Sequence, residues 1–235
     1  MNKTQGSKEL LHNLDRWCLW LEELTPTDLN KSTVLQERVK KCKAYREGSS
    51  RPATQKLANY PTLFGERRQP ENSYLCIPSV VSETRPFFTV QQLDSVVVAS
   101  NLAFTVDDPS GLSFALASSS MFIAWQKITG GRLKSDLRFS GTLVWNNFPV
   151  PALNESDRQK IISAGHKIEQ ARAKYADLTL ADLYNPLLMK PELRKAHEEL
   201  DRAVDQAFGA SRKLTTETKR LELLFANYQA ALKKG

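Results

Sequence analysis

The segment GRLKSDLRF, residues 131–139, gathers the side chains of this chain that are best suited to contact a nucleic acid. An arginine guanidinium can fork onto guanine or a phosphate, a lysine ammonium meets a phosphate as a point charge, and a serine hydroxyl can donate to a phosphate oxygen. The composition equally allows a solvated loop in which Asp136 pairs with a neighbouring arginine. The four candidate contacts are Arg132, Lys134, Ser135 and Arg138.

Residues for metal or acid–base chemistry are scarce. The three histidines are His12, His166 and His197, and none lies near a carboxylate pair at metal-ligand spacing. His197 stands among charged residues of a predicted helix, so we expect it on the solvent face. Metal catalysis is therefore not expected.

Two further motifs are better interpreted as structural. Gly130 and Gly131 follow a helical pattern, whereas a phosphate-binding glycine loop precedes its helix, so these glycines are expected to end the helix. WNNFPVP and YNPLL superficially resemble the Asn-Pro-Pro-aromatic loop with which amino-methyltransferases grip a flipped base. Neither has adjacent prolines followed by an aromatic residue, so we interpret five residues as structural: Asn146, Asn147, Phe148, Asn185 and Pro186.

Charge is distributed unevenly around this segment. The net charge is +7, which favours a polyanionic partner, and residues 31–56 carry eight basic against two acidic side chains. Residues 73–151 carry five of each and are neutral. Further candidate DNA contacts are therefore Arg51 and Lys56 in the basic stripe, and Arg67, Arg68 and Arg85 on loops near the predicted sheet.

The elements that would position these residues form an α+β fold. RWCLWL, residues 16–21, predicts a buried strand; Thr27 is expected to cap a helix that ends at Gly48, and Pro52 to start a shorter one. From Tyr74 the chain is rich in β-formers. One helix is expected over residues 114–128, and GTLVWNN, residues 141–147, predicts another strand.

After Pro151 the pattern is almost wholly helical. Asn154 or Ser156, Pro191 and Thr216 are expected to begin three amphipathic helices that could pack as a small bundle.

Three widely spaced cysteines give no zinc spacing and are expected to be reduced. No apolar run reaches the roughly 18 residues of a membrane span, so we expect a soluble, cytoplasmic protein without a membrane partner.

The chain resembles the C-terminal part of the MmeI-like DNA methyltransferases, which include combined restriction and modification enzymes of type II. The order and spacing of several blocks carry the resemblance: RWCLWL, RPATQKLANYPTLFGERRQP, YLCIPSVVSETR, SSSMFIAWQKITGGRLKSD, NNFPVP and ADLYNPLLMKPELRKAHEELDRAVDQAFG. Arg132, Lys134, Ser135 and Asp136 match the family pattern. Phe122, Leu137 and Val150 depart from it, because histidine, an aromatic residue and tryptophan are usual there.

The resemblance implies three parts: the trailing edge of a methyltransferase domain in residues 1–48, a β-rich target recognition domain in residues 49–151, and a helical C-terminal domain in residues 152–235. It implies S-adenosylmethionine as cofactor of the full-length parent. Neither a glycine-rich cofactor loop nor the base-gripping tetrapeptide occurs here, so we expect no catalytic or cofactor residue in this chain.

The resulting expectation is the portion of an adenine-specific DNA methyltransferase that reads double-stranded DNA, with the catalytic methyltransferase domain or subunit as a second partner. The alternative is a protein-interaction module whose helical tail docks a catalytic subunit while the basic stripe is merely solvated. A third reading, an intact methyltransferase, predicts that this chain binds S-adenosylmethionine.

Overall fold

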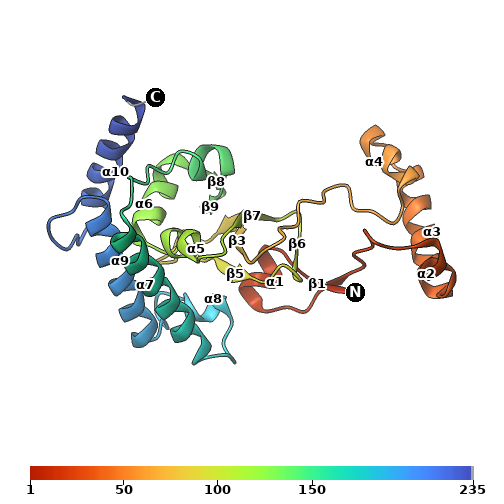
Figure 1. The fold of residues 1–235 in the computed structure, drawn as a ribbon, viewed down its shortest axis with the longest axis horizontal. Coiled ribbons are helices and arrows are strands. Elements are labelled where there is room, and N and C mark those ends of the chain that lie inside the picture. Colours follow the sequence, from red (N-terminus) through yellow and green to blue (C-terminus); the bar gives the residue numbers. More distant parts are fainter. Residues whose placement is uncertain (234–235) are drawn as a thin grey trace. The chain divides into compact units, whose positions relative to one another are not determined.

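The computed structural model describes residues 1–233, which form two compact units (Figure 1). Unit 1 comprises Met1–Lys3 and Trp17–Arg68, and unit 2 comprises Thr4–Arg16 and the chain from Gln69 onward. Helices and small sheets alternate up to residue 151 and helices dominate afterwards, so the predicted α+β class is confirmed.

Unit 1 is mostly helical. The start of β1 (Asn2–Gln5) pairs antiparallel with β2 (Trp17–Cys18), and α2 (Pro26–Asn30), α3 (Thr33–Glu47), α4 (Pro52–Lys56) and the 3-10 turn η1 (Leu57–Asn59) follow. The predicted buried strand is wrong in extent and burial, because β2 is an edge strand of two residues whose Trp17 is 55% exposed. The predicted cap at Thr27 is also wrong: Thr25 caps α2, and Ser32 restarts the helix as α3. The predicted end at Gly48 and start at Pro52 are confirmed.

The centre of unit 2 is a three-stranded antiparallel sheet in the order β5 (Gln91–Leu93), β3 (Tyr74–Pro78), β7 (Ala103–Asp107). Every residue of β3 is buried, as its central place and its apolar sequence require. The end of β1 pairs in parallel with β6 (Val98–Ala99), and α1 (Ser7–His12) follows β1. A smaller sheet has the order β4 (Val80–Val81), β9 (Asp136–Arg138), β8 (Gly131–Leu133).

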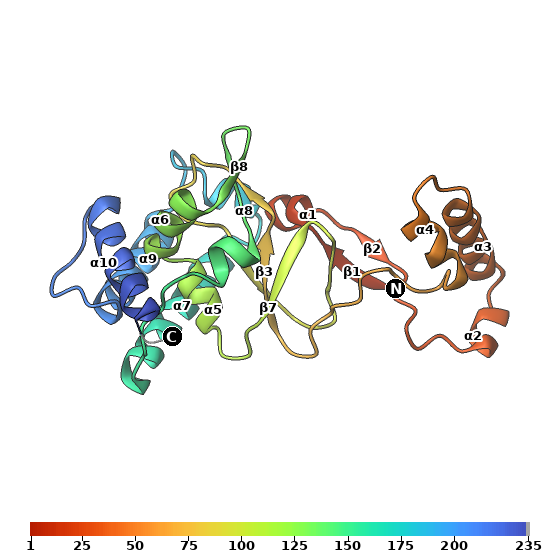
Figure 2. The same cartoon turned by 90° about the horizontal axis from the view of Figure 1, so that it is seen from above.

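Two helices, α5 (Leu112–Ala117) and α6 (Ser120–Thr129), replace the single helix expected over residues 114–128. Ser119 has extended backbone, and its hydroxyl accepts the N–H of Phe122 at 3.2 Å, which restarts the helix as a side-chain cap. Gly130 ends α6, as predicted. The break allows the two helices to take different directions over the sheet (Figures 1 and 2).

The strand predicted for GTLVWNN is wrong, because residues Gly141–Trp145 form the π-helical turn η2. The Ser140 hydroxyl accepts the N–H of Leu143 at 3.2 Å, and the carbonyl of Val144 accepts the indole N–H of Trp125 at 3.0 Å. A short apolar run does not distinguish a strand from a buried helical turn by its periodicity alone. Here the hydrogen bonds of the Ser140 hydroxyl and the Trp125 indole stabilise the π-helical turn.

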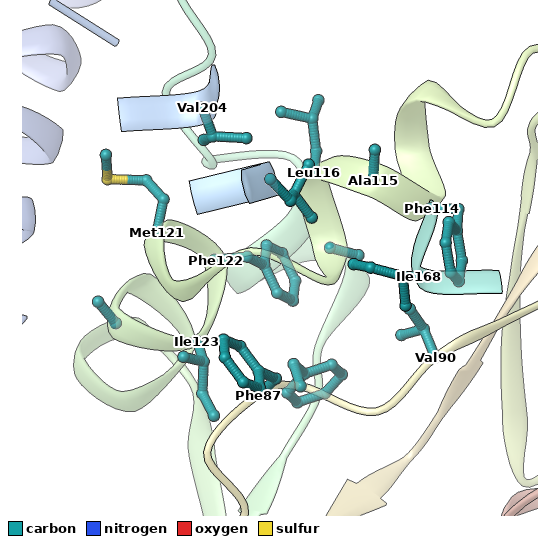
Figure 3. Close-up of a cluster of buried hydrophobic side chains, with 14 of the residues drawn as sticks. Phe87, Val90, Phe114, Ala115, Leu116, Met121, Phe122, Ile123, Ile168 and Val204 are labelled. Carbon is teal, nitrogen blue, oxygen red and sulfur yellow. The ribbon is translucent and has the colours of Figure 1, made fainter. Parts of the chain in front are cut away.

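Four helices complete unit 2: α7 (Glu155–Ala173), α8 (Leu180–Leu183), α9 (Pro191–Ala207) and α10 (Glu217–Leu232). Asn154 caps α7, Pro191 begins α9 and Thr216 caps α10, as predicted. The predicted small bundle forms only in part: α7 packs on α9, but α7 also packs on α5 and α10 packs mainly on α6, so the helical tail shares one core with the preceding residues. Figure 3 shows part of that core, with Phe114 near Ile168 and with Phe122 and Val204 in the same cluster.

Candidate nucleic-acid interface

The basic segment of residues 131–138 forms a β-hairpin. β8 and β9 pair antiparallel with Leu133 opposite Asp136, which leaves Lys134 and Ser135 as the turn. Lys134 has φ of 57°, in the left-handed region that residues other than glycine rarely adopt. Figure 2 shows the hairpin standing out from unit 2, so the loop expected here is instead a paired ribbon.

The base of the hairpin is fixed in the protein interior. Leu137 is buried and pairs with Val81 of β4 on one side and with Arg132 of β8 on the other. The Gln126 amide near the end of α6 donates to the carbonyl of Arg138 at 3.1 Å. The hairpin therefore presents an exposed tip on a rigid base.

Arg132 is held by two acceptors. Its Nη1 donates to Oε2 of Glu83 at 2.8 Å and to the carbonyl of Ser135 at 2.8 Å. The side chains of Arg132 and Glu83 are 46% and 43% exposed. Arg132 lies opposite Leu137, and neighbouring residues of a strand point to opposite faces, so the pairing with Asp136 allowed by the sequence does not form.

The remaining hairpin candidates are open to solvent. Lys134, Ser135 and Arg138 are all exposed. Within residues 1–233 neither Lys134 nor Arg138 has a carboxylate at ion-pair distance. A turn with one lysine, one hydroxyl and a nearby arginine can meet phosphate oxygens or base edges without first breaking an ion pair.

Arg85 has a different environment from the other candidates. It is half-buried, and its Nη1 donates to Oγ1 of Thr89 at 3.2 Å and to the carbonyl of Leu180 at 3.2 Å. Burial lowers the pKa of Arg85, and the nearby charges of Asp136 and Asp182 act against that shift. Its guanidinium is therefore engaged inside the protein, and we leave it out of the proposed DNA contacts.

The candidates of unit 1 lie on its surface. Arg67 is 3.8 Å from Glu22, and Arg68 is 3.3 Å from Glu66. Arg51 and Lys56 are exposed at the two ends of α4. These four cations belong to a unit other than that of the hairpin.

The basic stripe of residues 31–56 contains one arginine with a structural role. Arg46 donates to the carbonyls of Leu57, Tyr60 and Leu63 at 2.9, 2.8 and 2.8 Å, and so holds the chain after α4 against α3. The number of charges in the sequence does not distinguish Arg46 from the solvent-exposed cations around it. The other cations of α3 include Arg38, Lys40 and Lys41, which are exposed.

The expectation that His197 faces solvent is wrong, because its side chain is fully buried. Its ring stacks on Phe87 at 3.8 Å between centroids, and burial lowers the pKa of His197 well below the usual value. His197 follows Leu193 by four residues and precedes Leu200 by three, a spacing that places all three on one helical face. This spacing could have indicated that His197 is buried, but its charged neighbours in the sequence suggested that it is exposed.

The start of α5 does not offer free backbone donors to an anionic cofactor group. Gly111, with φ of 78°, opens α5, but the N–H groups of Ser113 and Phe114 at that helix end already donate to the Asp108 carboxylate at 3.0 and 2.8 Å. An anionic cofactor group would find these donors occupied. No three His, Cys, Asp or Glu side chains of the described chain cluster to hold a metal ion.

The two asparagine motifs serve local structure. The Asn147 amide donates to the carbonyls of Thr142 and Leu143 at 2.7 and 3.2 Å, which braces the π-helical turn. Oδ1 of Asn185 accepts the N–H of Leu187 at 2.9 Å.

Across residues 1–233, no helix combines the length and apolar character that crossing a bilayer requires.

Comparison with known proteins agrees with this geometry. The family model described as "MmeI, target recognition domain" matches residues 1–152, and the one described as "MmeI, C-terminal domain" matches residues 153–234. DNA methyltransferase A of Bacillus subtilis (strain 168) is 34% identical over 224 residues, covering 95% of this chain and 25% of that protein.

A solved structure with the same fold is described as "Structure of Type IIL restriction-modification enzyme MmeI in complex with DNA has implications for engineering of new specificities". It aligns with a TM-score of 0.93 and 36% identity over 99% of this chain and 31% of its own. The chain thus spans between a quarter and a third of these relatives. Because the two family models cover almost its whole length, the chain belongs to the MmeI family of restriction–modification DNA methyltransferases, within which it corresponds to the target recognition and C-terminal domains.

Proposed function

We propose that this chain reads the DNA sequence for an adenine-specific, S-adenosylmethionine-dependent methyltransferase of the restriction–modification type. The family membership, a relative named as a DNA methyltransferase, and a matching enzyme solved with DNA support the proposal. Its partner is double-stranded DNA, and a role on cellular DNA implies a cytoplasmic location.

The observation that carries the proposal is the β8–β9 hairpin, which has an exposed basic tip on a buried base. A two-stranded ribbon fits the major groove of B-form DNA, where each base pair shows its own pattern of donors and acceptors. We assign Lys134 to a phosphate, Ser135 to a phosphate oxygen or a base edge at the tip, and Arg138 to the flank. Arg132 lies beside them with part of its guanidinium exposed.

In this proposal, the attraction to phosphates and the recognition of bases come from different residues. Arg51, Lys56, Arg67 and Arg68 of unit 1 provide attraction to phosphates that does not depend on sequence. The neutral residues 73–151 provide directed contacts to bases. Binding is then expected to weaken with salt, while discrimination between sequences depends on the hairpin.

Selection from a pool of randomised duplexes tests the proposal directly. The 235-residue chain is mixed with the pool at low salt, bound duplexes are sequenced, and the affinity of the enriched duplex is measured across a salt series. We expect an enriched motif and an affinity that falls linearly with salt on logarithmic axes. An absence of both enrichment and salt-dependent binding would show that the chain is not a DNA reader.

A second function, docking of the catalytic methyltransferase domain or subunit, is favoured by unit 1. No side chain of helix α3 is fully buried, and large apolar residues of this unit are exposed, among them Val34, Tyr45 and Tyr60. Contiguous exposed apolar patches mark protein contacts, and we propose that these side chains form one. The apolar faces of α7 and α9 are packed in the core of unit 2, so we propose unit 1 rather than the helical tail for this role.

This docking proposal agrees with the expectation that residues 1–48 are the trailing edge of a methyltransferase domain, although the recognition-domain match also includes them. The test is capture of the methyltransferase domain of the same system by the chain. The double substitution Tyr45→Ser and Tyr60→Ser should abolish capture and leave duplex binding intact. Undiminished capture by this variant would assign docking to another surface.

A further inference from the structure

We propose that the turn of residues 82–85 is a positioning element that fixes the tip of the β8–β9 hairpin and ties it to the C-terminal domain, with Glu83 as the residue that determines how sharply the hairpin discriminates between sequences. The inference rests on the proposed DNA-reading function. It gives the C-terminal domain a specific task, which is to hold the recognition hairpin in place.

The first contact of this turn is with the hairpin. The guanidinium Nη1 of Arg132 carries two hydrogens, and its two acceptors are Oε2 of Glu83 and the carbonyl of Ser135, both at 2.8 Å. Ser135 directly follows Lys134, whose left-handed backbone persists only where the surrounding structure holds it. Through Arg132, the Glu83 carboxylate therefore restrains the conformation of the tip.

The second contact is with the C-terminal domain. Arg85 lies two residues after Glu83, and its Nη1 reaches the carbonyl of Leu180, the first residue of α8. Coulombic attraction also links Arg85 to Asp136 of the hairpin and to Asp182 of α8.

The turn itself is stiffened by local bonds. The N–H of Arg85 donates to the carbonyl of Ser82 at 3.2 Å, and the hydroxyls of Ser82 and Thr84 lie 3.1 Å apart. A short hydrogen-bonded turn with one contact to each neighbour transmits the position of α8 to the hairpin tip. Side chains that read bases need this kind of support, because small displacements weaken directed hydrogen bonds.

The positioning effect of Glu83 on DNA binding can be distinguished from the effect of its negative charge. A carboxylate beside a DNA-binding surface repels phosphates, so the loss of that charge alone should tighten binding to all duplexes. Loss of a positioning contact should instead weaken the preferred duplex relative to a scrambled one. The charge effect leaves the specificity ratio unchanged, whereas the positioning effect lowers it; this ratio is the affinity for the preferred duplex divided by that for a scrambled duplex.

The test compares Glu83→Ala, Glu83→Gln and Arg132→Ala with a matched control, Glu222→Ala, which removes an exposed carboxylate from α10. We expect Glu83→Ala to lower the specificity ratio by about tenfold, the loss of a directed base contact. Arg132→Ala should cause a similar loss, and the double variant should be no worse than either single one. Glu83→Gln should be intermediate because its amide oxygen still accepts a hydrogen bond, and Glu222→Ala should match the unaltered chain.

Amide hydrogen exchange without DNA provides the second measurement. Faster exchange of the residue 134–136 amides in Glu83→Ala, with an unchanged melting temperature, is the expected result. A Glu83→Ala variant with an unchanged specificity ratio and unchanged exchange would overturn the positioning role. If the unaltered chain binds no duplex, the DNA-reading function fails and so does the link to specificity, whereas the exchange result still decides whether Glu83 holds the tip.

Discussion

The hydroxyl of Tyr184 lies 2.7 Å from Nε2 of His197, and both side chains are fully buried. Nδ1 of His197 lies 3.1 Å from the carbonyl of Ser118, which can only accept, so Nδ1 carries the proton and Nε2 accepts from the tyrosine. The oxygen of Tyr184 in turn accepts from Nε and Nη2 of Arg172 at 2.9 and 2.6 Å. This chain of bonds joins the helical C-terminal part to the residues before it, and it requires neutral histidine.

We predict that the folded chain loses stability on acidification through His197. Burial, and then the nearby Arg172 charge, hold the pKa of His197 well below its usual value, whereas in the unfolded chain it is about 6.5. Below pH 6.5 the unfolded chain binds the additional proton, so the free energy of unfolding is unaffected above that pH and falls as the pH drops toward the folded-state pKa.

Urea unfolding of the chain and of His197→Phe at about pH 7.5 and about pH 5.5, on either side of the ordinary histidine pKa, measures this loss. The variant lacks the titrating group, so its stability should fall less between the two pH values. The pKa values of Asp201 and Asp205 are raised by burial, and these carboxyls contribute equally to both proteins. Equal losses in the two proteins would show that His197 does not titrate on unfolding.

We predict that Tyr184→Phe destabilises the fold by about 1 to 3 kcal/mol, because it removes the partner of the buried His197 acceptor and of the half-buried Arg172 donors. The matched control is Tyr175→Phe, since the Tyr175 hydroxyl bonds to Glu192 at the surface. That change should cost less than about 0.5 kcal/mol. Denaturant midpoints of the two variants compare the buried and the exposed hydroxyl directly, and similar midpoints would contradict the argument.

We predict a large difference between two ion pairs of helix α9. Arg220 of α10 forks onto Asp205 through Nε and Nη2 at 2.9 and 2.8 Å, and both side chains are buried. Asp205→Ala removes the fork and leaves the buried arginine charge with only the longer contact to Asp201 at 3.6 Å, so it should cost about 3 kcal/mol. Lys167→Ala removes the surface pair with Glu199, which spans 2.7 Å, and should cost less than about 1 kcal/mol. Thermal melts of both variants provide the comparison, and a Lys167→Ala loss as large as that of Asp205→Ala would refute it.

The sequence predicted those features that depend on local chemistry. Asn154, Pro191 and Thr216 mark helix starts because a cap or a fixed φ acts within a few residues of its own position. The sequence did not predict the burial of His197, since the ring is covered by Phe87, which is more than a hundred residues away in the chain.

In the candidate site, too, the contacts between distant residues could not be predicted from the sequence. The residue types of the hairpin tip were visible in the sequence, and the family resemblance indicated what they do. The partner of Arg132 is Glu83, 49 residues earlier, and no spacing rule connects the two. Arg85 was chosen for its charge, but its carbonyl partner lies 95 residues later, at Leu180. Contacts between distant segments form only when the chain packs, so motif spacing does not reveal them.

We predict that Lys134 binds a phosphate and does not read a base. Its ammonium is a compact point charge at the exposed tip of the hairpin, and it lacks the planar fork that pairs with guanine. Lys134→Ala should weaken binding to all duplexes by similar factors and reduce the logarithmic salt slope by about 0.9. Lys213→Ala, which removes an exposed lysine between α9 and α10, serves as the control and should leave the slope unchanged. The measurement is a salt titration of both variants against duplexes altered at one base pair at a time, and an affinity loss confined to one base pair would make the phosphate assignment wrong.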